Sequence, residues 1–209
     1  MKRIDLYKKL LKYKEISECY ESFDLLMGKI EDECFDLAKN RKIHELVNKI
    51  NTYYSTRASS QEMNDICAYL KTNIKRVYSK KYDRNIVNEI ANLTLNSKSR
   101  KQSKSNKQRK RQSRSLASKI MYFINSDNYP IYDGYARDAL IDINDKYSLC
   151  LGNLKNEFTK LENKKTFDYD KYKKIIDDFR NKLRIYNKEK KIINYIKIDK
   201  YLWIYGKNL

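Results

Sequence analysis

Residues that interrupt helices are scarce in this sequence. It contains one proline and four glycines among 209 residues. An all-β fold needs a turn signal about every ten residues, and glycine and proline supply most of those signals. Their scarcity argues against such a fold and favours helices joined by short polar links. We therefore expect an all-α protein, a single helical domain of roughly seven to nine helices.

Histidine and paired cysteines are also lacking. The only histidine is His44, which excludes a pair of catalytic histidines. The four cysteines lie far apart and form no C-x-x-C pair, whereas a zinc site needs ligands at close paired spacing. We expect no metal, no cofactor and reduced thiols in or near a helical core. These cysteines are Cys19, Cys34, Cys67 and Cys150.

Long apolar runs and glycine-rich loops are missing as well. No run approaches the length of a membrane span, and the charged start at residues 1–5 leads into no signal-peptide core. No glycine-rich phosphate loop is present, which argues against nucleotide hydrolysis. We expect a cytoplasmic protein that does not act on a membrane.

Positive charge is abundant. The sequence has 46 lysines and arginines against 27 acidic residues, a net charge of +19. The chain is also rich in lysine, asparagine, isoleucine and tyrosine, whose AT-rich codons indicate some compositional bias. That bias does not explain clustered arginine. An excess of this size attracts polyanions, so the composition predicts a polyanionic partner.

Apolar residues recur at the helical period in several stretches. The clearest covers residues 16–37, and others cover 43–50, 63–77 after the capping serines Ser59 and Ser60, 86–90, 116–124, 136–147 and 172–186. Residues 192–209 end in a helix capped by Asp199 and closed at Gly206, or in a short strand. The expected organisation is an N-terminal helical half (1–96), a basic loop or arm (97–115) and a C-terminal helical half (116–209) within one compact domain.

The basic stretch at 97–115 is the strongest functional signal. It holds nine lysines and arginines, no acid and no apolar residue. Such a segment neutralises phosphates and releases counterions, and arginine can grip a phosphate with two donors. We expect it to bind nucleic acid, DNA in preference to RNA. A solvated loop and an anionic membrane surface are the alternatives. The expected contacts come from Arg100, Lys101, Lys107, Arg109, Lys110, Arg111 and Arg114.

Tyrosine is the commonest aromatic residue, with nineteen copies. Aromatic rings can stack on unpaired bases, and the pair Tyr53 and Tyr54 fits that use. Most of the tyrosines fall on the helical stripes, however. Packing in the core, with the hydroxyl at the surface, is the favoured interpretation.

Two short segments carry a resemblance to known proteins. The string Ser115–Lys119 followed by Pro130–Asp133, and the ending at residues 199–207, resemble an uncharacterised bacterial family. That family in turn resembles helix-hairpin-helix DNA glycosylases of the 8-oxoguanine type. The resemblance implies that Lys119 is a nucleophile and Asp133 a carboxylate that stabilises positive charge as a base departs. The glycine-rich turn that precedes the lysine in those enzymes is absent here.

Three functions follow from these observations. The first is a nucleic-acid-binding protein that uses the basic stretch. The second is a DNA-repair or DNA-modifying enzyme built on Lys119 and Asp133. The plain alternative makes Lys119 an exposed or phosphate-binding residue and Asp133 a helix N-cap. The third is an interaction module whose basic surface meets an acidic protein.

Overall fold

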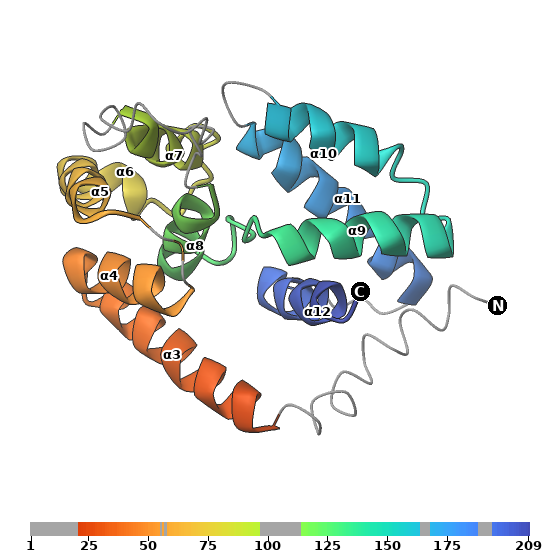
Figure 1. Ribbon diagram of the computed structural model, residues 1–209, viewed down its shortest axis with the longest axis horizontal. Coiled ribbons are helices and arrows are strands. Elements are labelled where there is room, and N and C mark those ends of the chain that lie inside the picture. The colour runs from red at the N-terminus through yellow and green to blue at the C-terminus, as the bar shows by residue number, and fades with distance from the viewer. Residues whose placement is uncertain (1–20, 55, 57, 97–113, 164–167, 188–193) are drawn as a thin grey trace, which may run out of the picture. The chain divides into compact units, whose positions relative to one another are not determined.

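The computed structural model describes residues 21–54, 56, 58–96, 114–163, 168–187 and 194–209, and within these ranges the protein is all-helical. Ten helices are present in the described residues, close to the number expected (Figure 1). None of them combines the length and the apolar character that crossing a membrane requires. The all-α prediction is confirmed.

The chain divides into two compact units, which are described separately. The central unit comprises residues 31–131 and 165–170, and the terminal unit comprises 1–30, 132–164 and 171–209. The units differ from the two halves expected on either side of 97–115. Helix α8 (Arg114–Ile124), which begins at the end of the basic stretch, packs with α4 and α7, two helices that precede the stretch.

The central unit holds the C-terminal part of α3 (Glu21–Lys39), followed by α4 (Ile43–Tyr53), α5 (Ser60–Thr72), α6 (Ile74–Val77), α7 (Ile86–Asn96) and α8. Helix α5 packs on α4 and α7, and α8 packs on the same two helices. The apolar stripes read from the sequence meet in this core, whose buried members include Leu46, Ile50, Ile66, Leu70, Val87, Ile90, Leu116 and Ile120.

The terminal unit holds α9 (Gly134–Tyr147), α10 (Leu154–Asn163), α11 (Tyr169–Asn187) from Lys171 onward, and α12 (Tyr195–Lys207). Its most extensive helix pairing is between α9 and α12 (Figure 1). Its core is rich in aromatic side chains, and the buried members include Leu140, Ile143, Phe158, Tyr172, Phe179, Tyr201 and Leu202.

Two expected helix starts are confirmed by their caps. Ser59 accepts a hydrogen bond from the backbone N–H of Glu62, and Glu62 accepts one from the backbone N–H of Ser59, which is a capping box. Asp133 caps α9 through its Oδ1, which accepts the N–H of Tyr135 at 2.9 Å. Both caps are local in sequence, which is why the pattern predicted them.

Two expectations about the helices were wrong, and one helix was missed. The helix expected to run to Val77 breaks at Asn73, which ends α5 and precedes α6. The last helix is capped by Asn194 rather than Asp199, so it begins four residues before Asp199 and extends to Lys207. Helix α10 was not predicted at all, although its buried Leu154, Phe158 and Leu161 have helical spacing.

Candidate nucleic-acid interface

Most of the predicted phosphate-binding side chains lie outside the described residues. These are Arg100, Lys101, Lys107, Arg109, Lys110 and Arg111. The seventh, Arg114, is the first residue of α8 and is half-buried. The binding role of all seven stays a prediction.

Lys119 is a buried residue in the middle of α8. Only 4% of it is exposed, whereas lysine is seldom buried in folded proteins. Its Nζ donates a hydrogen bond to the Ser115 hydroxyl at 2.6 Å and lies 5.0 Å from the ring centroid of Tyr54. The alternative of an exposed lysine was therefore wrong.

Asp133 belongs to the terminal unit, and Lys119 belongs to the central unit. Asp133 is half-buried and serves as the N-cap of α9. This is the structural role that the plainer alternative assigned to it. The pairing of Asp133 with Lys119 stays a prediction.

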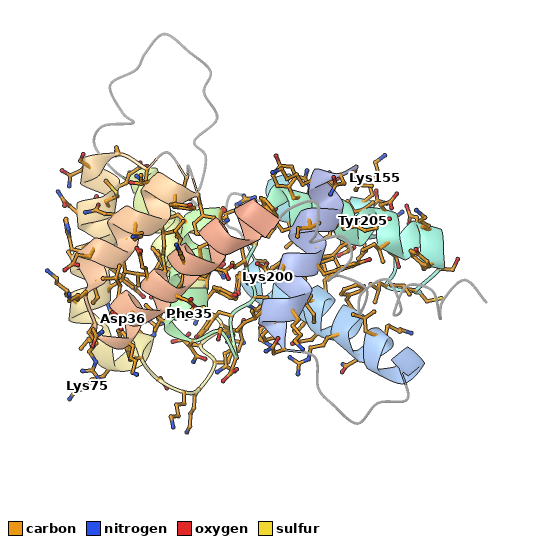
Figure 2. All side chains as sticks on the ribbon, turned by 90° about the horizontal axis from the view of Figure 1, so that it is seen from below. Phe35, Asp36, Lys75, Lys155, Lys200 and Tyr205 are labelled. Carbon is orange, nitrogen blue, oxygen red and sulfur yellow. The ribbon has the colours of Figure 1, made fainter. Side chains whose placement is uncertain are left out.

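A second cluster of cations, which the sequence interpretation missed, lies on α6 and on the turn that joins α6 to α7. We call residues 75–85 the basic turn. It carries five cations and a single acid, and four of the cations are exposed: Lys75, Lys80, Lys81 and Arg84. No ion pair joins any of these four to a described carboxylate. Lys75 points away from the helices of its unit (Figure 2).

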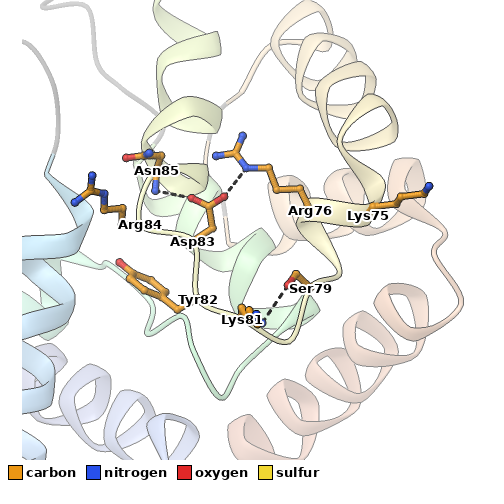
Figure 3. A pocket seen from close by; sticks show the side chains of 8 residues that line it. All are labelled: Lys75, Arg76, Ser79, Lys81, Tyr82, Asp83, Arg84 and Asn85. Atoms are coloured by element: carbon orange, nitrogen blue, oxygen red, sulfur yellow. Dashed lines mark hydrogen bonds and ion pairs between the residues drawn. The ribbon is translucent and has the colours of Figure 1, made fainter.

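The basic turn surrounds an open pocket with a volume of about 680 Å³. Figure 3 shows Arg76 and Asp83 pointing toward each other, while Lys75 and Arg84 point in other directions. The hydroxyl of Ser79 and the amide of Asn85 also line the pocket. Hydroxyl and amide groups add neutral hydrogen bonds to the charge that a phosphate would meet here.

Two asparagines from the turn after α8 hold the backbone of the basic turn. The side-chain amide of Asn125 donates a hydrogen bond to the carbonyl of Ser79 at 3.0 Å. The amide of Asn128 donates one to the carbonyl of Lys80 at 2.9 Å. Both partners are backbone atoms, so the anchors fix the path of the chain and leave the Lys80 ammonium group exposed.

Two tyrosines extend this anchoring. The buried hydroxyl of Tyr129 accepts the backbone N–H of Asp83 at 2.8 Å. Tyr82 packs against Tyr129, with ring centroids 5.3 Å apart, and its hydroxyl donates to a carboxylate oxygen of Asp170 at 3.2 Å. The basic turn is therefore held at four successive points along its backbone and side chains, from Ser79 to Asp83.

The fifth cation, Arg76, is used inside the fold. Its guanidinium donates two hydrogen bonds to Glu89, at 2.7 and 2.9 Å, and forms an ion pair with Asp83. Tyr69 donates its hydroxyl proton to the same Glu89 carboxylate. The hydrogen bonds from Arg76 hold the pKa values of Asp83 and Glu89 below their usual range. Arg76 thus links the basic turn to α7, and its guanidinium is not a candidate for binding a phosphate.

A further hollow of the central unit has the opposite charge. It lies between α3 and α4 and is lined by Asp32, Glu33, Asp36 and Glu45, with Lys49 paired to Glu33. Among the described residues no group of three or more histidine, cysteine or acidic side chains is arranged to hold a metal ion. An anion would be repelled from this hollow, so the basic turn is the better phosphate site of the two.

A signal for the basic turn does exist in the sequence. Residues 75–84 read KRVYSKKYDR, with five cations in ten residues. The run was overlooked because Val77, Tyr78 and Tyr82 interrupt it and because its anchors lie more than forty residues further along the chain. No family model, curated protein or solved structure matches the chain, so the candidate interface stands on its own geometry.

Proposed function

We propose that the protein binds nucleic acid, DNA in preference to RNA, and that the basic turn supplies phosphate contacts. The observation that carries this proposal is the fixed turn itself. Four exposed cations stand on a backbone that Asn125, Asn128 and Tyr129 hold in place, and no described carboxylate neutralises them. The net charge of +19 also favours the binding of a polyanion.

A turn whose backbone is already fixed loses less conformational entropy when it binds a phosphate. A mobile lysine loses rotational freedom when it meets a phosphate, and a mobile loop loses backbone freedom as well. The anchors have already removed the backbone part of that loss. Each cation that displaces a condensed counterion then adds affinity that declines with salt. Arg84 can also offer a phosphate two donors, which a lysine cannot.

The test is a salt titration with a labelled random-sequence duplex. For wild type, the logarithm of the binding constant should fall linearly with the logarithm of the salt concentration. In Lys80→Ala/Lys81→Ala the slope should shrink by about 0.9 for each phosphate contact removed. A flat response in the wild type would refute nucleic-acid binding through phosphates.

A matched control separates the turn from net charge. Lys146 and Lys155 are exposed lysines of the terminal unit, and their replacement by alanine removes the same two charges. Lys155 points outward (Figure 2). The control variant should keep nearly the wild-type slope. Equal losses in the two double variants would mean that the basic turn is no special site. Repeating both titrations with RNA measures the preference for DNA.

The predicted contacts at 97–114 form part of the same proposal. Their removal, from Arg100 to Arg114, should lower the slope independently of the basic turn. An acidic protein is the alternative partner for either surface. Capture of an acidic protein that survives nuclease treatment, with a flat salt response on DNA, would favour that alternative.

A second candidate function is a glycosylase-like activity on DNA, and the observation that favours it is the burial of Lys119. In this chemistry the neutral lysine amine adds to C1′ of the sugar. The glycosidic bond breaks, and the base leaves with its electron pair and takes up a proton. The added nitrogen then loses its extra proton and forms a C=N bond as the C1′–O4′ bond of the ring opens and O4′ takes up a proton. Borohydride reduces the resulting imine. Asp133 would stabilise the positive charge that develops on the sugar.

Borohydride trapping tests this activity directly. Duplexes that contain 8-oxoguanine or an abasic site should give a covalent adduct with the wild type and none with Lys119→Ala, while Lys155→Ala should give the wild-type yield. Absence of an adduct in the wild type would leave a binding protein without this chemistry.

A further inference from the structure

One aromatic surface of the terminal unit has a composition unlike that of the core. We call Tyr135, Trp203 and Lys207 the aromatic patch. The rings of Tyr135 and Trp203 have centroids 6.0 Å apart and stand at 83° to each other. The Nζ of Lys207 lies 4.9 Å from the Trp203 ring centroid. Two perpendicular rings and a cation therefore share one small surface.

The exposure of Tyr135 sets it apart. It is 47% exposed, and the only other large hydrophobic residue that is exposed among the described residues is Leu209, the last residue of the chain. Most other tyrosines of this unit whose side chains are described, such as Tyr172, Tyr195 and Tyr201, are buried. Leaving an aromatic ring in water forgoes the stabilisation that burial gives its neighbours. The exposed ring, beside Trp203 and Lys207, is accessible to a ligand.

The patch is built by a close crossing of α9 and α12. A Cβ at Gly206 would lie 2.0 Å from the carbonyl oxygen of Tyr135, so only glycine allows the two helices to approach this closely. The hydroxyl of Tyr205, labelled in Figure 2, donates to the Asp142 carboxylate at 2.5 Å and ties the same two helices together. Trp203 stands one helical turn before the crossing, and its position relative to Tyr135 is therefore fixed.

The charges around the patch favour an anionic partner with an aromatic surface. Helix α12 carries Lys197, Lys200 and Lys207 against one acid, Asp199. Tyr135 lies in the first turn of α9, next to the Asp133 carboxylate that caps this helix, so the positive charge beside the patch comes from α12. A nucleotide combines the two properties that such a surface meets, since its base has a flat π-face and its phosphate carries negative charge.

We propose that the aromatic patch stacks on an unpaired base of single-stranded DNA, with Lys207 beside the neighbouring phosphate. The inference rests on the proposed nucleic-acid binding and adds an unpaired base to it. Two rings at right angles form a corner. A base that lies flat on one ring meets the other ring with its edge, which is a favourable arrangement of aromatic groups. Stacking of this kind tolerates any base, so it demands an unpaired strand rather than a sequence.

Trp203 provides the readout because it is the only tryptophan in the chain. The full chain is titrated at low salt with short oligothymidylate and, separately, with a blunt-ended hairpin duplex, while tryptophan emission and anisotropy of a label on the DNA are followed. Oligothymidylate should quench the emission at saturation. The duplex should bind by anisotropy and leave the emission nearly unchanged.

Variants of Tyr135 separate stacking from folding. Tyr135→Ala should weaken oligothymidylate binding about tenfold, the lower part of the range for one stacked base, and leave duplex binding unchanged. Tyr135→Phe keeps the ring and should restore binding. Circular dichroism and thermal unfolding of both variants confirm that the fold is intact.

The outcomes are distinct. Duplex binding without quenching by oligothymidylate, or a Tyr135→Ala variant that binds oligothymidylate as tightly as the wild type, overturns the aromatic patch and leaves the proposed function standing. Equal weakening of duplex and oligothymidylate assigns Tyr135 a structural role and also overturns the inference. Failure of the wild type to bind either DNA overturns the proposed function, and the inference with it.

Discussion

Replacing Tyr129 by phenylalanine would test whether anchoring of the basic turn matters for binding. The change removes one oxygen atom and no charge. In the wild type this hydroxyl, on a side chain that is 1% exposed, accepts the backbone N–H of Asp83 at 2.8 Å. Phenylalanine would keep the packing against Tyr82 and leave that N–H without its acceptor.

The magnitude follows from the loss of this hydrogen bond and of the longer one, 3.4 Å, that the same hydroxyl donates to the carbonyl of Asp83. A buried donor left unsatisfied costs about 1–3 kcal/mol of stability. Part of that cost can be relieved if the turn moves and Asp83 reaches water, and such movement would release the cations from their fixed positions. We therefore expect the free energy of unfolding to fall by about 1–2 kcal/mol and DNA binding to weaken several-fold at unchanged net charge.

Two measurements check this prediction. Urea unfolding gives the change in stability, and the duplex titration at a fixed low salt concentration gives the change in affinity. Tyr135→Phe is the control for stability, because its hydroxyl is at an exposed site and its removal should change stability by less than about 0.5 kcal/mol. If Tyr129→Phe is destabilised but binds duplex with wild-type affinity, a fixed turn is not what binding requires.

Three further predictions concern stability and reactivity. Gly206→Ala should destabilise the terminal unit by about 3 kcal/mol, the upper end of the usual cost of overpacking, seen as a lower melting temperature, because the new Cβ would overlap a backbone carbonyl of α9. Acid should weaken the ion pairs that Arg76 forms with Asp83 and Glu89. The pKa values of these two carboxyl groups are lowered in the folded state, so they stabilise the fold fully above about pH 4, the usual carboxyl pKa. That contribution to the free energy of unfolding is lost as the pH falls further. In Arg76→Met the melting temperature should fall less between pH 6 and pH 3. Brief alkylation followed by mass spectrometry should modify the exposed Cys150 before the buried thiols of α3 and α5, whose pKa values burial raises.

Local signals in the sequence predicted much of the fold. The stripe of α4 and the caps of α5 and α9 depend on residues within one or two helical turns of each other, and each was found where the pattern placed it. The start of α12 was misplaced because Asp199 and Asn194 are both good N-caps by residue type. Only packing against α9 decided between them.

The candidate site was less accessible from the sequence. The seven predicted cations lie in one uninterrupted stretch, which made them conspicuous, but only Arg114 falls among the described residues. The cations of the basic turn become a site only through Asn125, Asn128 and Tyr129, which are distant in sequence. A pairing between segments that far apart leaves no periodic trace, so one sequence alone cannot reveal it.

The burial of Lys119 is a similar case. Its neighbours along α8 are almost all buried, so that helix has no solvent-facing stripe at this point. A lysine normally marks the exposed face of a helix, so its residue type predicted an exposed position. The ring of Tyr54 and the hydroxyl of Ser115, which line its position, could be recognised only in the folded protein.

The anchors of the basic turn end on backbone carbonyl and amide groups that every residue type except proline possesses. Replacing the side chains at Lys80 and Lys81 would leave those hydrogen bonds in place. The charge of this surface can therefore be changed without changing the path of its backbone. Reversal to glutamate should yield a folded protein that repels DNA, and other side chains there could redirect the same scaffold toward a different ligand.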